Sequence, residues 1–64
     1  MFIIRDDLGN YINAAESRHE ALELVEKYYI RDLEDGFFKQ NKYHLLDINN
    51  SEVERVSANF LRTL

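Results

Sequence analysis

Two histidines, His19 and His44, are the side chains of this sequence best suited to hold a metal or to act as a general base. The chain has no cysteine, so neither a cysteine-containing zinc site nor a cysteine nucleophile can form around them. Glu23 follows His19 by one helical turn, but His44 is far away in the sequence. We expect His19 to be solvated on a helix surface. For His44 we expect a strand surface or a hydrogen bond in the core, in preference to a role as general base.

Acidic residues are numerous, with 12 Asp and Glu among 64 residues, and could supply the paired carboxylates of a glycosidase. Such a pair must face across a cleft, and a domain that buries only about 60% of its unfolded surface rarely has one. Asp6, Asp7 and Asn10 could suggest a calcium loop, but the ligand spacing and closing glutamate of such a loop are missing. We expect turn chemistry there, no enzymatic activity, and no metal or cofactor.

The net charge of −4 is concentrated in residues 16–35, where seven acidic residues stand against Arg18, Lys27 and Arg31. The rest of the chain is balanced, with five acidic and five basic residues. The seven acidic residues are Glu16, Glu20, Glu23, Glu26, Asp32, Glu34 and Asp35. Because one sign of charge on a helix sets the field that a partner meets, this segment predicts binding to a basic surface. The alternative is that the acidic face is only solvated.

The sequence before and after this segment has the pattern of short β-strands. Phe2-Ile3-Ile4-Arg5 and Tyr11-Ile12-Asn13-Ala14 flank a loop in which Gly9 can adopt the positive φ of a type I turn with a bulge, so they predict a hairpin. A third strand is predicted within Lys42-Tyr43-His44-Leu45-Leu46-Asp47-Ile48. A short extended arm at Phe37-Phe38-Lys39 is a further possibility.

A long helix is predicted from Ser17, with Glu20 in capping-box spacing, to a stop at Gly36. Its apolar stripe is Ala21, Leu22, Val25, Tyr28, Tyr29 and Leu33. Its surface offers two four-residue ion pairs, Glu23 with Lys27 and Arg31 with Asp35. Glu34 and Asp35 lie at the carboxyl end, where the helix dipole favours cations, and such a departure from a stabilising rule can mark function.

A second helix is predicted after Asn49-Asn50, because Ser51 and Glu54 repeat the capping-box spacing. The residues of its apolar stripe are Val53, Val56, Ser57, Phe60, Leu61 and Leu64. This amphipathic helix would run to the last residue.

Together these elements predict an α+β fold in one domain, residues 1–64, with the order ββαβα. A right-handed crossover through the long helix places the third strand beside the first, in a three-stranded antiparallel sheet of order 2-1-3. The long acidic helix then covers one face of the sheet. The C-terminal helix packs beside the first helix, covers the other face or pairs with a second copy, and the sequence leaves all three placements open.

No segment has the pattern of a targeting or membrane element. Met1-Phe2-Ile3-Ile4 is too short for the apolar part of a signal peptide, and no apolar run approaches the roughly 20 residues of a membrane span. We expect a cytoplasmic protein with no membrane partner.

Two aromatic doublets, Tyr28-Tyr29 and Phe37-Phe38, hold more aromatic surface than one small core easily buries. At least one of these rings should be exposed. The rings either cover the helix flank and the sheet edge or anchor an interface. The residues that we predict to bind a partner are Glu23, Glu26, Tyr28, Tyr29, Glu34, Asp35, Phe37 and Phe38.

Three classes of function fit this sequence. The first is an inhibitor whose acidic helix occupies a basic groove that normally receives nucleic acid, with carboxylates substituting for phosphates. The second is a structural or regulatory interaction protein, possibly a homodimer. The third, direct nucleic-acid binding, is disfavoured because the basic residues form no dense run in the sequence. Those residues are Arg5, Lys39, Lys42, Arg55 and Arg62.

The chain resembles, in pattern, the small acidic proteins encoded by phages and prophages, including anti-CRISPR and other anti-defence inhibitors. The resemblance consists of the overall size, the opening Phe2-Ile3-Ile4-Arg5 into Asp6-Asp7-Leu8-Gly9-Asn10-Tyr11, and the helix start from Ser17 to Ala21. It covers about the first half of the chain. That class shares no catalytic motif, so the resemblance implies only a stoichiometric inhibitor of a host protein, often one that handles nucleic acid, such as a CRISPR effector nuclease.

Overall fold

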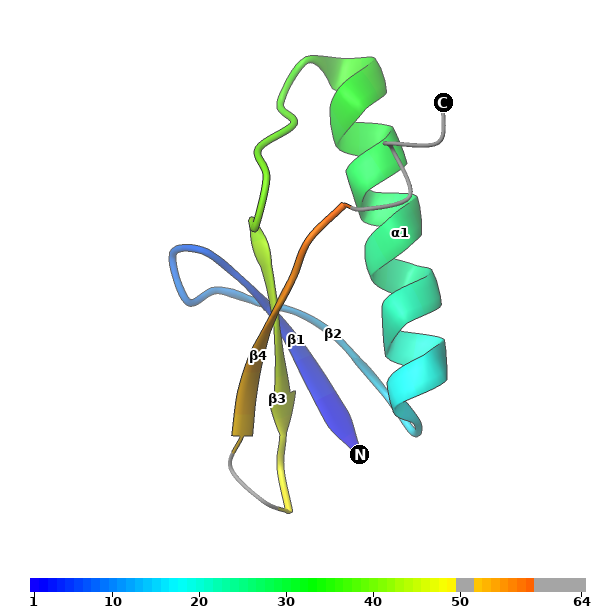
Figure 1. The fold of residues 1–64 in the computed structure, drawn as a ribbon, viewed down its shortest axis with the longest axis vertical. Helices are drawn as coiled ribbons and strands as arrows, with labels where there is room; N and C mark the ends of the chain where they lie inside the picture. Colours follow the sequence, from blue (N-terminus) through cyan, green and yellow to red (C-terminus); the bar gives the residue numbers. More distant parts are fainter. Residues whose placement is uncertain (50–51, 59–64) are drawn as a thin grey trace.

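The computed structural model describes residues 1–49 and 52–58, which form one helix packed against a sheet (Figure 1). The elements in chain order are β1 (Phe2–Asp6), β2 (Tyr11–Ala15), α1 (Arg18–Asp35), β3 (Tyr43–Asp47) and β4 (Glu52–Val56). The sheet has four strands in the order β2-β1-β3-β4, and every neighbouring pair is antiparallel. The α+β class and the order of the first three strands are therefore confirmed.

The loop between β1 and β2 is held by the side chain of Asp6. Its carboxylate accepts hydrogen bonds from the backbone N–H groups of Leu8 and Asn10, at 2.9 and 2.8 Å. Gly9 has a φ of 85°, a conformation that costs glycine little. A register shift follows between Ile4 and Arg5, so that Arg5 pairs with Tyr11. The predicted hairpin with a turn and bulge is confirmed, and the pairing fixes which side chains of β1 share a face.

Helix α1 begins and ends where its capping residues predict. The Ser17 side chain accepts a hydrogen bond from the backbone N–H of Glu20, which satisfies a donor that has no partner inside the helix. Gly36 ends the helix in the left-handed conformation, with a φ of 80°, and its N–H bonds to the carbonyl of Leu33. Gly36 thus closes the last turn as predicted.

The prediction of a second helix starting at Ser51 is wrong for the described residues that follow it. Glu52–Val56 is a strand, β4, and pairs in full register with β3. The edge of β3 offers backbone partners along a whole strand, and Glu54, expected in a helical cap, instead accepts two hydrogen bonds from Arg18 of α1. Ser51 itself and the predicted stripe residues Phe60, Leu61 and Leu64 lie outside the described residues.

The core lies between α1 and the inner face of the sheet. Its largest fully buried side chains are Tyr29 and Val25 of α1, Ile4 of β1 and Leu45 of β3. Ala15, Ala21, Tyr43 and Ala58 complete the buried apolar cluster. The segment between α1 and β3 has no strand, so the extended arm considered at residues 37–39 does not form one.

The predicted apolar stripe of α1 is correct except at its last position. Leu33 is 45% exposed, whereas Asp32 is only 6% exposed. Asp32 lies two turns after Val25 on the same side of the helix, so the helical repeat directs it to the core. An acidic side chain is stable there because Tyr43 and Lys42 bind its carboxylate.

Candidate partner-binding surfaces

The described residues do not assemble a metal centre. Within residues 1–49 and 52–58, no group of three or more His, Cys, Asp or Glu side chains is placed to hold an ion. In that same part of the chain, no helix combines the length and apolar character needed to cross a bilayer. The features that stand out are two surfaces of contrasting charge, one on α1 and one on the sheet.

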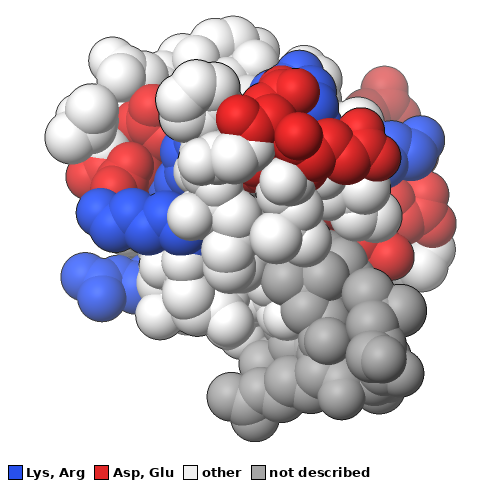
Figure 2. Space-filling view, turned by 90° about the horizontal axis from the view of Figure 1, so that it is seen from above, with Lys and Arg blue, Asp and Glu red and all other residues white. Residues whose placement is uncertain are grey.

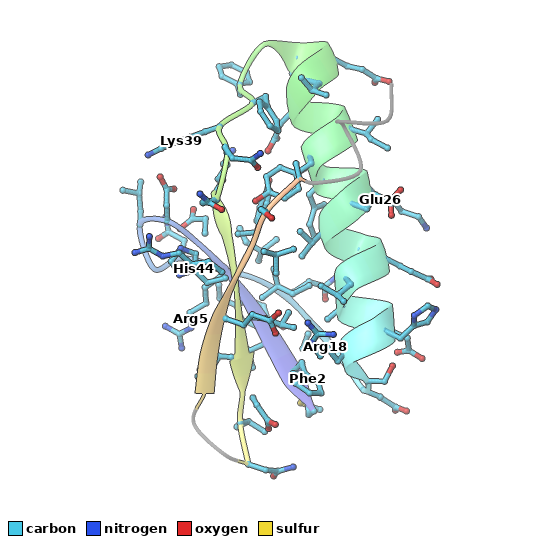
Figure 3. All side chains as sticks on the ribbon, viewed as in Figure 1. Phe2, Arg5, Arg18, Glu26, Lys39 and His44 are labelled. Atoms are coloured by element: carbon cyan, nitrogen blue, oxygen red, sulfur yellow. The ribbon has the colours of Figure 1, made fainter. Side chains whose placement is uncertain are left out.

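The outer side of α1 carries exposed acidic and aliphatic side chains, and we call this surface the acidic helix face. Its members are Glu23, Glu26, Ile30, Leu33, Glu34 and Asp35, all exposed. Figure 3 shows Arg18 pointing from α1 toward the strands, whereas Glu26 lies on a flank of α1, where it lines a hollow together with Val56 and Ser57. Ile30 and Leu33 are 42% and 45% exposed among the acids. In Figure 2, red acidic side chains predominate from the centre to the right of the view. The face therefore joins negative charge to aliphatic surface.

Among the described residues, Glu26, Glu34 and Asp35 form no ion pair. Glu23 pairs with His19 at 2.7 Å instead of with Lys27. Arg31 lies over the ring of Tyr28, 5.3 Å from its centroid, instead of pairing with Asp35. The two predicted four-residue ion pairs are thus absent from the ion pairs of the described residues. Among the described residues, the acidic charge of Glu26, Glu34 and Asp35 is therefore not bound in an ion pair.

Two basic side chains near the helix are engaged elsewhere. Arg18 forms a two-point ion pair with Glu54 of β4, which holds the pKa of that carboxyl below its usual range. Lys42 binds the carboxylate of Asp32 at 3.1 Å. These pairs hold α1 against β3 and β4; Lys42 neutralises the buried Asp32 of α1, whereas Arg18 is bound to a carboxylate of the sheet.

The buried Asp32 is part of a polar network at the carboxyl end of α1. Its carboxylate accepts a hydrogen bond of 2.6 Å from the hydroxyl of Tyr43. The Tyr29 hydroxyl accepts a bond from the backbone N–H of Tyr43 and donates to the carbonyl of Val56. Burial, followed by the bond to Asp32, raises the pKa of Tyr43 far above its usual value. Sequence reasoning missed this network, because it counts Asp32 only among the acidic residues of the helix, and the partners that stabilise its burial lie in another element.

The four aromatic rings of the two doublets have different surroundings. Tyr29 is fully buried, and Phe38 packs against it with ring centroids 5.6 Å apart. Tyr28 is half-buried and its hydroxyl accepts a hydrogen bond from Asn13. Phe37 is 72% exposed, so the expectation that at least one ring is exposed is confirmed. Among the predicted partner-binding residues, Phe37 and the four acids lie at the surface, whereas Tyr29 belongs to the core.

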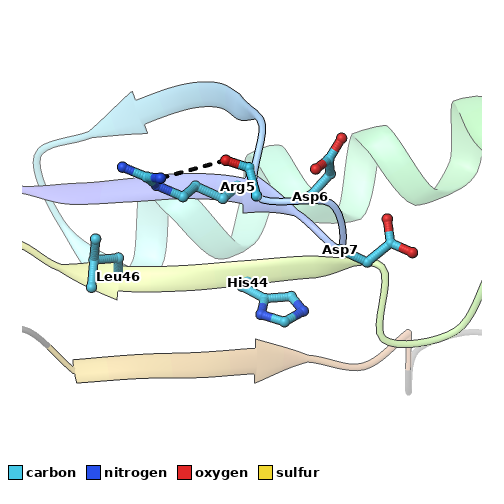
Figure 4. A pocket seen from close by; sticks show the side chains of 6 residues that line it. Arg5, Asp6, Asp7, His44 and Leu46 are labelled. Carbon is cyan, nitrogen blue, oxygen red and sulfur yellow. Dashed lines mark hydrogen bonds between the residues drawn. The ribbon is translucent and has the colours of Figure 1, made fainter.

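The second surface lies on the side of the sheet that faces away from α1, and we call it the open sheet face. Arg5 of β1, His44 of β3 and Arg55 of β4 stand directly opposite one another across the three strands. Ile3 and Leu46 are paired in the same way two residues along, on the same side of the sheet. Figure 4 shows Arg5, His44 and Leu46 on their strands, with α1 behind the sheet. Within the described residues, no element covers this face.

Two acidic residues lie at the rim of the open sheet face, and both have partners. Asp6 is bonded by the turn, and these backbone bonds, chiefly from Asn10, lower its pKa. Asp7 binds Lys39 at 2.6 Å, which lowers its pKa as well. Both acids line a hollow of about 400 Å³ that also borders Arg5 and His44. Arg55 forms no ion pair with another described residue, so the middle of the face stays basic.

Both histidines lie where the sequence predicts. His19 is an exposed residue of the first turn of α1, and His44 lies on a strand surface. The basic residues form no dense run in the sequence, and in the fold the strand register places Arg5 and Arg55 on either side of His44. Strand alternation could have placed each of them on a face, but only the pairing aligns them in one row.

Comparisons with protein-family models, with curated proteins and with solved structures each found no match. Inference about function therefore rests on the two surfaces and their chemistry.

Proposed function

We propose that this protein is a small binding inhibitor whose acidic helix face docks on a basic surface of another protein. The observation that carries the proposal is the exposed cluster of carboxylates on α1, of which Glu26, Glu34 and Asp35 form no ion pair with another described residue. Six acidic residues of α1 stand against three basic ones, and one of the basic ones, Arg18, is paired with β4. A basic partner would be attracted by this field and would supply the missing cations.

The partner that fits best is a protein with a nucleic-acid-binding groove. Carboxylates repeated along a rigid helix present negative charge at intervals, as a phosphate backbone does, so both would compete for the same lysines and arginines. In line with the resemblance to phage-encoded inhibitors, we propose a host protein of the cytoplasm, such as a CRISPR effector nuclease. Direct nucleic-acid binding, an enzymatic reaction and a cofactor have no part in this proposal.

Aliphatic and aromatic side chains beside the acids add to the case for a protein partner. Ile30 and Leu33 are exposed within the acidic helix face, and Phe37 follows its carboxyl end with its ring largely in solvent. Burial of such side chains by a partner lowers the free energy and so favours binding, whereas a face that is only solvated obtains no such contribution from them. Charge would guide the encounter, and apolar contact would lengthen the life of the complex.

A second candidate function is a structural or regulatory protein that self-associates. The open sheet face favours it, because Ile3 and Leu46 lie there beside Arg5 and Arg55, neither of which forms an ion pair with another described residue. The two candidates differ in the partner, which is a foreign protein in one case and a second copy in the other.

Capture from a bacterial lysate with matched charge variants tests the proposal. The variant Glu26→Arg/Glu34→Arg reverses two carboxylates on the outer side of α1, both of them exposed. The control Glu16→Arg/Glu20→Arg makes the same change in net charge at the start of the helix, where both residues are also exposed. Captured proteins are identified by mass spectrometry, and the partner is then purified for binding measurements.

We expect the unaltered protein and the control to bind the partner, and the Glu26/Glu34 variant to bind at least about tenfold more weakly, because like charges across an interface repel. Binding should weaken as salt rises, and DNA or RNA should compete with it. Equal binding by all three proteins would contradict the proposal. So would a complex in which the partner holds nucleic acid and this protein at the same time.

A further inference from the structure

We infer that the open sheet face of one molecule binds the acidic helix face of a second molecule of the same chain. The two faces lie on opposite sides of the fold, one on the sheet and one on the outer side of α1. Their charges are opposite, and each carries aliphatic side chains beside its charges. The structure thus supplies both halves of the contact.

The sheet half of the contact is a row of basic residues with an aliphatic row beside it. Arg5 and Arg55 are separated by one strand, and neighbouring strands lie about 4.8 Å apart, so the two arginines are about 10 Å apart across the sheet. His44 lies between them, and the pair Ile3 and Leu46 lies two residues along the strands. This half presents two permanent cations with an aliphatic patch at their side.

The helix half repeats that pattern with the opposite charge. Glu26, Ile30 and Glu34 follow one another at four-residue steps, so they lie along one side of α1. A rise of 1.5 Å per residue puts Glu26 and Glu34 about 12 Å apart along the axis. Ile30 lies between them, and Leu33 lies on the flank, one turn after Ile30 and two turns after Glu26. This half presents two anions with an aliphatic patch between and beside them.

The two halves match in spacing and chemistry. The separation of the two glutamates exceeds that of the two arginines by only about 2 Å, which long flexible side chains can span. A helix laid across the strands would bring Glu26 and Glu34 to Arg5 and Arg55, and each arginine can bind a carboxylate through two parallel hydrogen bonds. Ile30 and Leu33 would then cover Ile3 and Leu46.

The other way of covering the sheet with a second copy is electrostatically poor. A sheet-to-sheet dimer would bring two rows of arginine together, and like charges in an interface cost free energy. Asp6 and Asp7 could relieve this only by leaving the backbone donors and Lys39 that they already bind. The acidic helix of a second copy needs no such rearrangement.

A contact between two different faces has a consequence for the size of the assembly. After two molecules bind, one of them still has a free helix face and the other a free sheet face. The contact can therefore repeat, and it builds rings or open chains instead of stopping at a dimer. This inference uses the same acidic helix face as the proposed function, and so rests on that face being a docking surface. The sheet half belongs to this inference alone.

Sedimentation velocity at low salt, from micromolar to millimolar protein, tests the inference with three variants. Arg5→Glu/Arg55→Glu reverses the sheet half, Glu26→Arg/Glu34→Arg reverses the helix half, and the third variant combines all four changes. All four positions are exposed, and circular dichroism melts check that each variant is folded. We expect the unaltered protein to grow beyond a dimer with concentration, each double variant to stay a monomer, and the combined variant to associate again.

Several results would overturn the inference. The unaltered protein could stay a monomer throughout, or the helix reversal could leave association intact, which would indicate a sheet-to-sheet contact. Association of the unaltered protein without recovery in the combined variant would also count against it. Capture of a basic partner by the sheet variant Arg5→Glu/Arg55→Glu separates the two proposals, because that variant retains the acidic helix face. If the unaltered protein captures a basic partner but does not self-associate, the proposed function stands and this inference is refuted.

Discussion

The hydroxyl of Tyr43 donates a hydrogen bond of 2.6 Å to the carboxylate of Asp32, and this contact fixes the last turn of α1 to the first residue of β3. Asp32 is also bound by Lys42, the residue just before the strand. The backbone carbonyl of Asp32 accepts a further bond from Phe37 after the helix. One acidic residue thus joins the helix end, the following loop and the central part of the sheet, which sets the position of the acidic helix face relative to the strands.

Replacement of Tyr43 by Phe should destabilise the protein by about 1.5 to 3 kcal/mol, the range for a hydrogen bond to a charged group. The ring would still fill its place in the core, but the buried carboxylate of Asp32 would lose a donor. Urea unfolding followed by circular dichroism measures the change. Replacement of the exposed Glu34 by Gln on the same helix is the control and should leave the urea midpoint within error. An unchanged midpoint for Tyr43→Phe would mean that the bond contributes nothing.

Stability should fall as pH rises through and beyond 10.0, the ordinary pKa of tyrosine. Burial raises the pKa values of Tyr43 and Tyr29 in the folded state, so the unfolded chain ionises first and draws the equilibrium toward unfolding. The contribution is complete below pH 10.0 and is lost above it. Urea midpoints across this range should decline less steeply for Tyr43→Phe than for the unaltered protein. Parallel declines would show that groups present in both proteins, such as Tyr29 and the lysines, are the cause and that Tyr43 is not.

Local signals in the sequence predict the hairpin and the long helix because their determinants lie within a few residues. The Gly9 turn and the Ser17 cap are satisfied by neighbouring backbone groups. Ser51 and Glu54 have the same capping spacing, yet a strand follows. Glu54 is bound by Arg18, which is 36 residues away, and β4 pairs with the free edge of β3. Such distant partners are not visible in a local window, and they prevail over the local preference.

The candidate surfaces were predictable to different degrees for the same reason. Acidic residues off the apolar stripe of a helix must face solvent, so Glu23, Glu26 and Glu34 could be placed from periodicity alone. The basic row of the open sheet face depends on strand register, which positions Arg5 opposite residues far along the chain. From the sequence we list Asp32 only among the acids of the helix, and its burial depends on partners in another element.

Replacement of Ser17 by Ala should cost about 1 kcal/mol, as the loss of an amino-terminal cap commonly does. The Ser17 side chain accepts a bond of 3.2 Å from Glu20, and Ala cannot replace it. Replacement by Asp, which also caps helices well, is the matched control and should keep nearly full stability. Thermal melts compare the three proteins. Equal losses for Ala and Asp would show that the hydroxyl acts in some way other than capping.

The same change, Leu to Ala, should destabilise the protein strongly at Leu45 and hardly at all at Leu33. Leu45 is almost fully buried between α1 and the sheet, so its truncation should cost about 2 to 5 kcal/mol and leave much of so small a domain unfolded. Leu33 is 45% exposed, and its truncation should change stability by no more than about 0.5 kcal/mol.

Urea unfolding of both variants tests whether the acidic helix face, on which both proposed contacts depend, is exposed to solvent. If Leu33→Ala proves as damaging as Leu45→Ala, Leu33 is a core residue and the acidic helix face loses part of its aliphatic surface. If Leu33→Ala is neutral in stability but weakens binding to a basic partner or to a second copy, the residue acts at the interface. The free energy of unfolding and the affinity then separate, as expected for a surface residue that contacts a partner.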